Sequence, residues 1–257
     1  MDPGARQGAI LALLKAEGRV LVDDLSARFA VSPQTIRKDL NALARARLIG
    51  RIHGGASTAS GIENLEYEAR RRLAAEAKTA IGRAAAALVP DGASLFVNIG
   101  TTTEAVAAAL ADRAGLMVIT NNINVANLLR TRPGIEVVIA GGVVRASDGG
   151  IVGEAAVDFI RQFKVDLAII GASAIDGDGA LLDFDFREVK VAQAIIENAR
   201  HVVLVADRSK FERTAPVRIG HLSQVDVFVT DHCDRASIRR ICAESAVQLV
   251  EAGADAA

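Results

Sequence analysis

The stretch VSPQTIRKDL (31–40) combines a helix start with side chains that bind nucleic acid. Ser32 is a favourable N-cap because its hydroxyl can accept a hydrogen bond from a free amide of the first turn, and Pro33 fits the first helical position. Ile36, Leu40 and Leu43 recur at helical spacing and predict a core-facing stripe. The opposite face carries side chains that bond phosphates or base edges, and with Ser32 these candidates are Gln34, Thr35, Arg37, Lys38 and Asn41. An ordinary solvated helix face is the alternative interpretation.

Three predicted helices and a hairpin surround this stretch. The helices are predicted over 8–16, 22–30 and 33–47. The last two are joined by a tight turn, and the third is polar and basic on its outer face, which is typical of a helix-turn-helix. The segment LIGRIHGGA (48–56) then predicts the hairpin wing of a winged helix. Arg51 and His53 would be exposed at its tip, where we expect them to contact the DNA backbone. We expect no metal at His53, because no nearby residue completes a site.

Charge is distributed unevenly along the chain, whose net charge is −1. Residues 1–60 hold nine Lys or Arg and five Asp or Glu, whereas residues 61–257 hold 21 and 26. A basic head attracts phosphate, and an acidic body keeps the rest of the chain off nucleic acid.

Residues 75–257 alternate between apolar runs and helical segments. Strands are predicted over 94–99, 116–120, 135–140, 166–171, 201–206 and 226–230. Helices are predicted over 75–88, 103–111, 123–130, 154–163, 187–198 and 235–244. Most of the strands are nearly continuous apolar runs, as in strands that are covered on both faces. The alternation predicts an open, mostly parallel α/β sheet.

Polar residues follow four of these strands, at the edge of the sheet where open α/β folds bind ligands. Small residues, hydroxyls and free amides at a helix start suit an anion such as phosphate. The candidate ligand-binding residues in these loops are Gly100, Thr101, Thr102, Thr103, Asn121, Gly141, Gly142, Arg145 and Lys210. Ordinary helix caps and turns are the alternative. The chain has neither GxxxxGK[ST] nor GxGxxG after a strand, which disfavours a nucleotide site.

A further loop, DGDGALLDFDFREVK (176–190), gathers four aspartates. Their spacing lacks the ordered pattern of a calcium loop. We expect the loop to lie beside the ligand pocket, with Asp183 or Asp185 accepting hydrogen bonds from ligand hydroxyls. Cys233 and Cys242 have no partners at zinc-ligand spacing, so we expect no metal and no cofactor.

The composition is that of a globular protein with a sizeable core, with 257 residues of which 51% are hydrophobic and 24% charged. No apolar run reaches the roughly 18–20 residues that span a bilayer. The first residues, MDPGARQGAI, lack the basic and apolar regions of a secretory signal. We expect a cytoplasmic protein with reduced thiols and no membrane partner.

Together these motifs resemble one protein family. VSPQTIRKDL followed by RIHGGA resembles the DNA-binding domain of the DeoR family of bacterial repressors. NIGTTTEAV, TNNINVANLL, AGGVVR, GASAIDGDGALLDFD and VADRSKF resemble its effector-sensing domain, so the resemblance covers nearly the whole chain in order. SPQTIRKDLN, SDGGIVGEAAVDFI and DFDFREVKVAQAIIENARHVVLV are most similar to the members that respond to glycerol 3-phosphate. Lys38 departs from the arginine usual in the family and keeps the charge without the bidentate fork, which favours a phosphate contact.

The resemblance implies a repressor with a winged helix-turn-helix domain over 1–57, a linker over 58–72 and an effector-binding and oligomerisation domain over 73–257. The implied partners are operator double-stranded DNA and a phosphorylated small molecule that releases the repressor. Glycerol 3-phosphate is the expected effector, and another sugar phosphate is the alternative. We expect a homo-oligomer, either a dimer or a tetramer.

The resemblance also implies that the sensing domain shares its fold with ribose 5-phosphate isomerases, so a sugar-phosphate isomerase is the main alternative function. Those enzymes carry DGADE after a central strand, and its acidic pair transfers the proton. This chain has IGASAI at the similar place, with Ser173 and Ala174 where the acids would stand. Neither residue is a general base near neutral pH, so we expect no enzyme activity. A purely structural or oligomerising protein would leave the polar loops unexplained.

Overall fold

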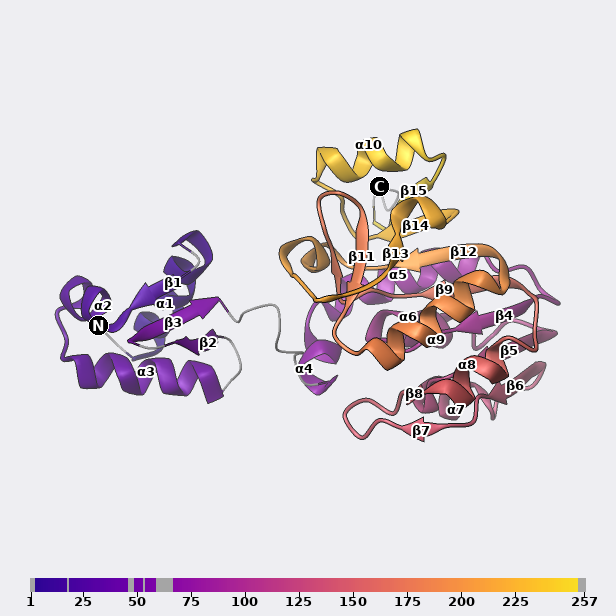
Figure 1. Ribbon diagram of the computed structural model, residues 1–257, viewed down its shortest axis with the longest axis horizontal. Coiled ribbons are helices and arrows are strands. Elements are labelled where there is room, and N and C mark those ends of the chain that lie inside the picture. The colour runs from indigo at the N-terminus through magenta and orange to yellow at the C-terminus, as the bar shows by residue number, and fades with distance from the viewer. Residues whose placement is uncertain (1–2, 18, 46–48, 53, 59–66, 254–257) are drawn as a thin grey trace. The chain divides into compact units, whose positions relative to one another are not determined.

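The computed structural model describes residues 3–17, 19–45, 49–52, 54–58 and 67–253. The chain forms two compact units, residues 1–65 and 66–257, and each is described by itself (Figure 1). The division falls inside the segment that the sequence predicts to be a linker. Among the described residues, no helix is long and apolar enough to cross a membrane.

The N-terminal unit has the predicted helix-turn-helix and wing. Its elements are α1 (Pro3–Glu17), β1 (Arg19–Leu21), α2 (Val22–Phe29), α3 (Pro33–Arg45), β2 (Ile49–Ile52) and β3 (Gly55–Thr58). Ala30 ends α2 in the left-handed conformation, and the chain turns there into α3. The strands form an antiparallel sheet in the order β1-β3-β2, so β1 extends the predicted hairpin by one strand.

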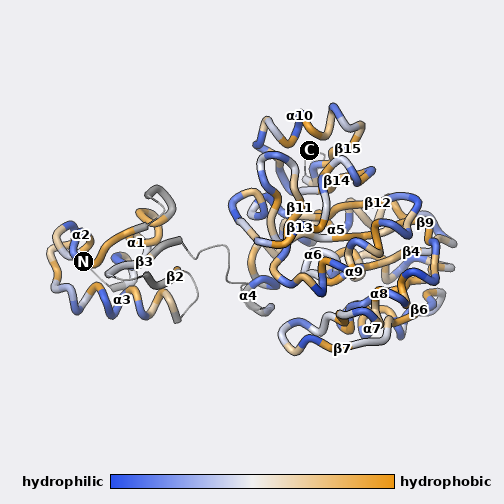
Figure 2. Tube along the Cα trace, viewed as in Figure 1, coloured by the Kyte–Doolittle hydropathy of each residue, from blue (hydrophilic) through white to orange (hydrophobic). Residues whose placement is uncertain are grey.

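Apolar packing and one buried ion pair hold α3 in place. Ile36 and Leu40 of α3 are fully buried beside Ile10 of α1, as the helical spacing predicts. The Arg6 Nε atom of α1 lies 2.6 Å from the Asp39 carboxylate of α3, and both side chains are buried. Hydrophilic and apolar residues alternate along α3 (Figure 2), as in a helix with one buried face.

The C-terminal unit is built on a seven-stranded parallel sheet, which contains the six predicted strands and one more. Its strand order is β15-β14-β12-β9-β4-β5-β6. The strands are β4 (Ser94–Val97), β5 (Leu116–Thr120), β6 (Ile135–Ile139), β9 (Val165–Ile170), β12 (Ala199–Val205), β14 (Val227–Thr230) and β15 (Gln248–Glu251). The helices are α4 (Tyr67–Arg72), α5 (Ala75–Ala87), α6 (Thr101–Ala109), α7 (Ile123–Leu129), α8 (Glu154–Ile160), α9 (Phe186–Glu197) and α10 (Ala236–Glu244).

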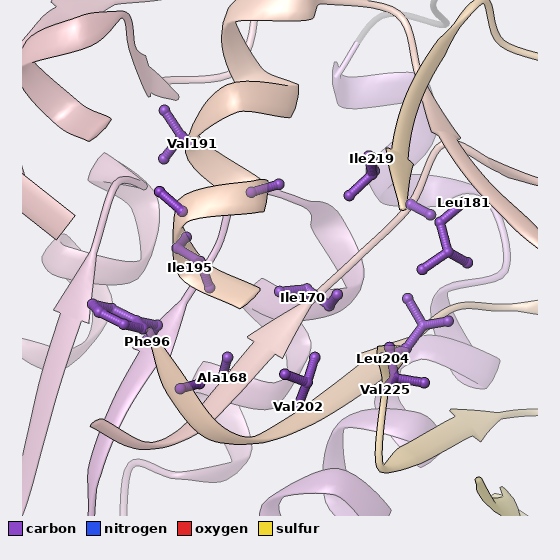
Figure 3. Packing of buried hydrophobic residues seen from close by; sticks show 14 of the residues in the cluster. Phe96, Ala168, Ile170, Leu181, Val191, Ile195, Val202, Leu204, Ile219 and Val225 are labelled. Carbon is purple, nitrogen blue, oxygen red and sulfur yellow. The ribbon is translucent and has the colours of Figure 1, made fainter. Parts of the chain in front are cut away.

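The sheet is buried on both faces, which explains its nearly continuous apolar strands. Alternate residues of β4 enter different clusters, since Phe96 packs with α8 and α9 whereas Leu95 and Val97 pack with α5, α6 and α7. Figure 3 shows the first of these faces, where Ile195 of α9 lies above Ala168 of β9. The parallel strands place their carboxyl ends at one edge, and the polar loops follow that edge.

Several short strands were not predicted. They are β7 (Val143–Val144), β8 (Ile151–Val152), β10 (Ala174–Ile175), β11 (Ala180–Asp183) and β13 (Val217–His221). The first two pair with each other, and the last three form a small antiparallel sheet. Runs of two to five residues inside polar loops carry too little periodicity to be recognised. The edge strand β15 was also missed, because Gln248 and Glu251 leave it only two apolar residues, Leu249 and Val250.

We predict that Asp39→Ala destabilises the N-terminal unit by about 3–5 kcal/mol, because it leaves the Arg6 guanidinium buried without its carboxylate. Urea denaturation followed by hydrogen exchange in each unit measures this. Lys38→Ala is the matched control, since Lys38 is exposed on the same turn and its loss should change stability by less than about 0.5 kcal/mol. Equal stabilities of the two variants would show that the ion pair does not hold α3.

Candidate functional site

The N-terminal unit gathers the predicted DNA-binding residues on one surface. Gln34, Arg37, Lys38 and Asn41 are exposed on α3. Together with Thr35 and residues of α1 they line a groove of about 830 Å³. The Ser32 hydroxyl caps the helix, because it accepts a hydrogen bond from the Thr35 amide at 3.2 Å. The surface is therefore a helix face that offers amide, hydroxyl and cationic groups together.

The wing is described only in part. Arg51 lies in β2, where its backbone pairs with Ala56 of β3, but its side chain falls outside the described part of the structure. His53 also lies outside the described residues. The predicted contacts of Arg51 and His53 with DNA stay predictions.

In the C-terminal unit, Gly100 to Thr103 form the turn from β4 into α6. Gly100 is the N-cap and has a φ of 147°, a conformation that favours glycine. The Thr103 hydroxyl is held inside the turn, 2.7 Å from the Asn98 carbonyl and 2.8 Å from the Gly100 carbonyl. Thr102 is buried and Thr101 is half-buried at the start of the helix. The turn offers backbone amides and the Thr101 side chain, whereas the Thr103 hydroxyl serves the turn itself.

Lys210 is a buried cation at the carboxyl edge of the sheet. It lies in a short 3-10 helix (Arg208–Glu212) that follows β12, and it is 8% exposed. Burial and the nearby charge of Arg213 lower its pKa to about 7. Within the described residues its ammonium makes no hydrogen bond and no ion pair.

Three further cations lie near Lys210. Its charge interacts with those of Arg70, Lys78, Arg213 and Asp207. Burial also lowers the pKa of Lys78, which is 4% exposed, and the pKa of Arg213. We call Arg70, Lys78, Lys210 and Arg213 the cation cluster. The charge of Asp207 acts on Lys78, Lys210 and Arg213, and that of Glu104 also acts on Lys78. Asp148 pairs with Arg70 but also with Arg145, so the four cations still outnumber the carboxylates beside them.

Buried polar atoms without partners gather at the same loops. In the described part of the chain they are Asn98 Oδ1, Asn121 Oδ1, Asp207 Oδ2 and Arg70 Nε. Asn98 follows β4, Asn121 follows β5 and Asp207 follows β12, so the three acceptors lie at the carboxyl edge. Asn121 is fixed by a bond from its Nδ2 to the Ile151 carbonyl at 3.1 Å. Buried polar groups are nearly always hydrogen-bonded, so three acceptors and a donor left open indicate a binding site.

Arg145 is already engaged with acidic side chains. Its guanidinium lies 2.6 Å from Asp148, 2.6 Å from Glu188 and 3.4 Å from Asp185. Burial and the charge of Asp183 raise the pKa of Glu188 to about 8, against the opposing charge of Arg145. The structure thus gives Arg145 a role in ordering the loop before β8, and its charge is largely neutralised there.

Asp183, Gly141 and Gly142 are the remaining residues that were predicted to bind the ligand. Asp183 is buried in β11, where it accepts hydrogen bonds from the Ser173 hydroxyl at 2.9 Å and from the Phe184 amide at 2.6 Å. Gly141 and Gly142 are exposed in the turn before β7. A Cβ atom at Gly142 would lie 3.0 Å from Ile151, so that position favours glycine for packing.

Five residues of this site were not predicted as ligands, namely Arg70, Lys78, Asn98, Asp207 and Arg213. Asn98 and Asp207 stand at the ends of predicted strands, in the same loops as the chosen residues, and that position could have identified them. The positions of Arg70 and Lys78 give no such indication, because both lie within helices, where a basic side chain is ordinarily exposed. The described residues contain no group of three or more His, Cys, Asp or Glu that could hold a metal ion.

Comparison with known proteins agrees with this organisation. A family model for the DeoR-like helix-turn-helix domain matches residues 6–61, and one for the DeoR C terminal sensor domain matches residues 73–232. The glycerol-3-phosphate regulon repressor of Escherichia coli (strain K12) is 47% identical over 249 residues, covering 97% of this chain and 99% of that protein. The Haemophilus influenzae protein of the same name is 50% identical over 230 residues, covering 90% of each chain.

Among solved structures, ribose 5-phosphate isomerase A from Methanocaldococcus jannaschii is similar with a TM-score of 0.41 and 18% identity, covering 54% of this chain and 55% of that one. The two family models and the full-length relatives settle the classification without it. The chain belongs to the DeoR family of helix-turn-helix transcriptional repressors and is not an enzyme.

Proposed function

We propose that this repressor binds operator DNA through α3 and is released from it by glycerol 3-phosphate. The observation that carries the effector assignment is the cation cluster, in which Lys210 and Arg213 both interact with the charge of Asp207 while the buried Lys210 ammonium makes no hydrogen bond or ion pair within the described residues. Burying unpaired charge is costly, so this arrangement favours an anion with more than one negative charge. A phosphate monoester near pH 7 is such an anion.

The unpartnered acceptors support a hydroxylated ligand. Asn98 Oδ1, Asn121 Oδ1 and Asp207 Oδ2 can each accept a hydrogen bond from an alcohol. A ligand with a phosphate at one end and hydroxyls at the other would satisfy both parts of the site. Asp183 is a further acceptor for such hydroxyls, although Ser173 and Phe184 already donate to it.

The names of two relatives support the choice of glycerol 3-phosphate as the ligand. Two proteins whose names refer to the glycerol-3-phosphate regulon are 47% and 50% identical to this chain over nearly its whole length. Glycerol 3-phosphate carries one phosphate and two hydroxyls, which fits the chemistry of the site. Another sugar phosphate is the alternative effector.

The DNA-binding surface favours the major groove. Gln34, Arg37 and Asn41 have the side chains that read base edges, whereas Lys38 suits a phosphate. We propose that the repressor binds as a homo-oligomer, a dimer or a tetramer, with operator half-sites separated by multiples of about 34 Å.

We predict that Arg37→Ala weakens operator binding by about 1–3 kcal/mol and relaxes preference at one base pair, because it removes a base contact. Lys38→Ala should weaken all sequences about equally and flatten the dependence on salt. Gel shifts with the operator and single-base variants measure both effects. Arg130→Ala removes the same charge from the exposed surface of the C-terminal unit and is the control. If Arg37→Ala binds every sequence like the parent, α3 is not the reading helix.

We predict that Lys210→Gln weakens binding of glycerol 3-phosphate by about 10- to 100-fold, since it removes a charge-assisted hydrogen bond worth roughly 1.5–3 kcal/mol. Operator binding should be unchanged, which gives a repressor that the effector no longer releases. Lys190→Gln is the matched control, because Lys190 is exposed and paired with Glu154.

Calorimetry and operator gel shifts with glycerol 3-phosphate, glycerol, and ribose and fructose phosphates test this assignment. Release by another sugar phosphate and none by glycerol 3-phosphate would overturn the choice of effector. Release by unphosphorylated glycerol alone would overturn the phosphate site itself.

We predict that effector affinity declines as pH rises above about 7. The Lys210 pKa is lowered to about 7, so in the free protein the ammonium loses its proton above that pH, and dianion binding must then take a proton up. The decline approaches a factor of about ten per pH unit. Lys210→Arg keeps its charge and should flatten the profile. Calorimetry between pH 6.5 and pH 9 measures it, and parallel profiles for both proteins would contradict the role of Lys210.

A further inference from the structure

The short helix α4 is the first described element after the segment that leads from the DNA-binding unit. It lies at the same end of the C-terminal unit as β11 and β13 (Figure 1). Leu73, which follows it directly, is 42% exposed, so this residue adds little apolar anchoring. Polar bonds at both ends of α4 attach it to the sensor.

Two members of the cation cluster hold the C-terminal end of α4. The buried Lys78 ammonium donates to the Arg70 carbonyl and, at 2.8 Å, to the Leu73 carbonyl. These carbonyls belong to the last turn, where a helix leaves its acceptors unpaired. Arg70 itself donates to Asp148 at 3.1 Å and keeps its buried Nε without a partner. The groups that fasten this end of α4 are therefore the groups offered to the phosphate.

The N-terminal end of α4 is held by a separate network. The Tyr67 hydroxyl donates to Glu104 at 2.6 Å and accepts from Asn124 at 3.1 Å. Asn122 also donates to Glu104, at 3.1 Å, which joins the network to the loop after β5. Tyr67, Lys78, Thr101 and Glu104 line one groove of about 540 Å³ where α4 meets α5 and α6.

We propose that α4 is the coupling element between the two functions. An effector phosphate draws Lys78 and Arg70 away from the α4 carbonyls and Asp148, and α4 then leaves the sensor. This inference rests on the proposed function, because it assumes that a phosphate binds at the cation cluster. The docked form of α4 is the form that binds operator DNA.

The competition follows from the strengths of the bonds. A hydrogen bond from an ammonium or guanidinium to a phosphate is charge-assisted on both sides, whereas the bonds from Lys78 now end on neutral carbonyls. The ammonium has only three donors, and two of them already serve α4. Binding and release are then linked reciprocally, so whatever loosens α4 also strengthens effector binding.

The variant Tyr67→Phe tests whether α4 couples the two functions without changing any residue of the cation cluster. The variant loses the bonds to Glu104 and Asn124 but no group of the cation cluster. We expect it to bind glycerol 3-phosphate about 2- to 10-fold more tightly than the parent and to bind operator more weakly, because the released form becomes more populated. A residue with only a structural role would leave effector affinity unchanged or lower it. Thr79→Ala is the matched control, since its hydroxyl lies in the same groove and bonds only to Ala75 of its own helix.

Hydrogen exchange of the unmodified full chain is the second measurement and needs no variant. Saturating glycerol 3-phosphate should speed exchange of the amides of α4 by about 5- to 150-fold, the usual range of allosteric coupling. Calorimetry on the same sample establishes whether the effector binds. Binding with unchanged exchange in α4, or Tyr67→Phe that binds effector no more tightly than Thr79→Ala, would overturn the coupling alone. Absence of binding would overturn the proposed function, and this inference with it.

Discussion

The desolvation of positive charge at the end of the sheet constrains the C-terminal unit. Lys78 and Lys210 are almost completely buried, yet Asp207 supplies the carboxylate that acts on both of them. A folded chain keeps such charges buried only if the surrounding scaffold is stable enough to offset their cost. The two apolar clusters on either face of the parallel sheet supply that stability. The core therefore offsets the cost of burying these two lysines at the end of the sheet.

The arrangement of the loops follows from the same sheet. Because β12, β9, β4 and β5 are neighbours and run parallel, residues separated by more than 100 positions in the chain converge at one edge. Asn98, Asn121 and Asp207 each follow a different strand of this sheet. The parallel order of the strands therefore places their unpartnered oxygen atoms at the same edge. Arg145 differs, because its guanidinium is already paired with the acidic side chains of Asp148, Asp185 and Glu188.

The secondary structure and the buried faces could be predicted from the sequence where the hydrophobic periodicity is strong. The stripe of Ile36 and Leu40 predicts which face of α3 is buried, and the apolar runs predict the strands of the large sheet. The ion pairs that occupy Arg145 could not be predicted, because Glu188 approaches it from a helix some 40 residues further along. The burial of Lys78 could not be predicted either, because it depends on contacts with α4 and the residue after it. Tertiary contacts decide these cases, and periodicity carries no information about them.

The ion pair between Arg6 and Asp39 has a consequence for how the repressor meets DNA. Asp39 belongs to the lining of the groove that carries Arg37 and Lys38, so its carboxylate lies beside these two cations. The Arg6 guanidinium lies 2.6 Å from that carboxylate and compensates its charge, so Arg37 and Lys38 remain as the exposed charges of the groove. Long-range attraction to a polyanion sets how often an encounter begins, before any base is read. The same side chain that pairs α1 with α3 therefore also compensates a negative charge in this groove, and its loss would be expected to slow encounters with a polyanion.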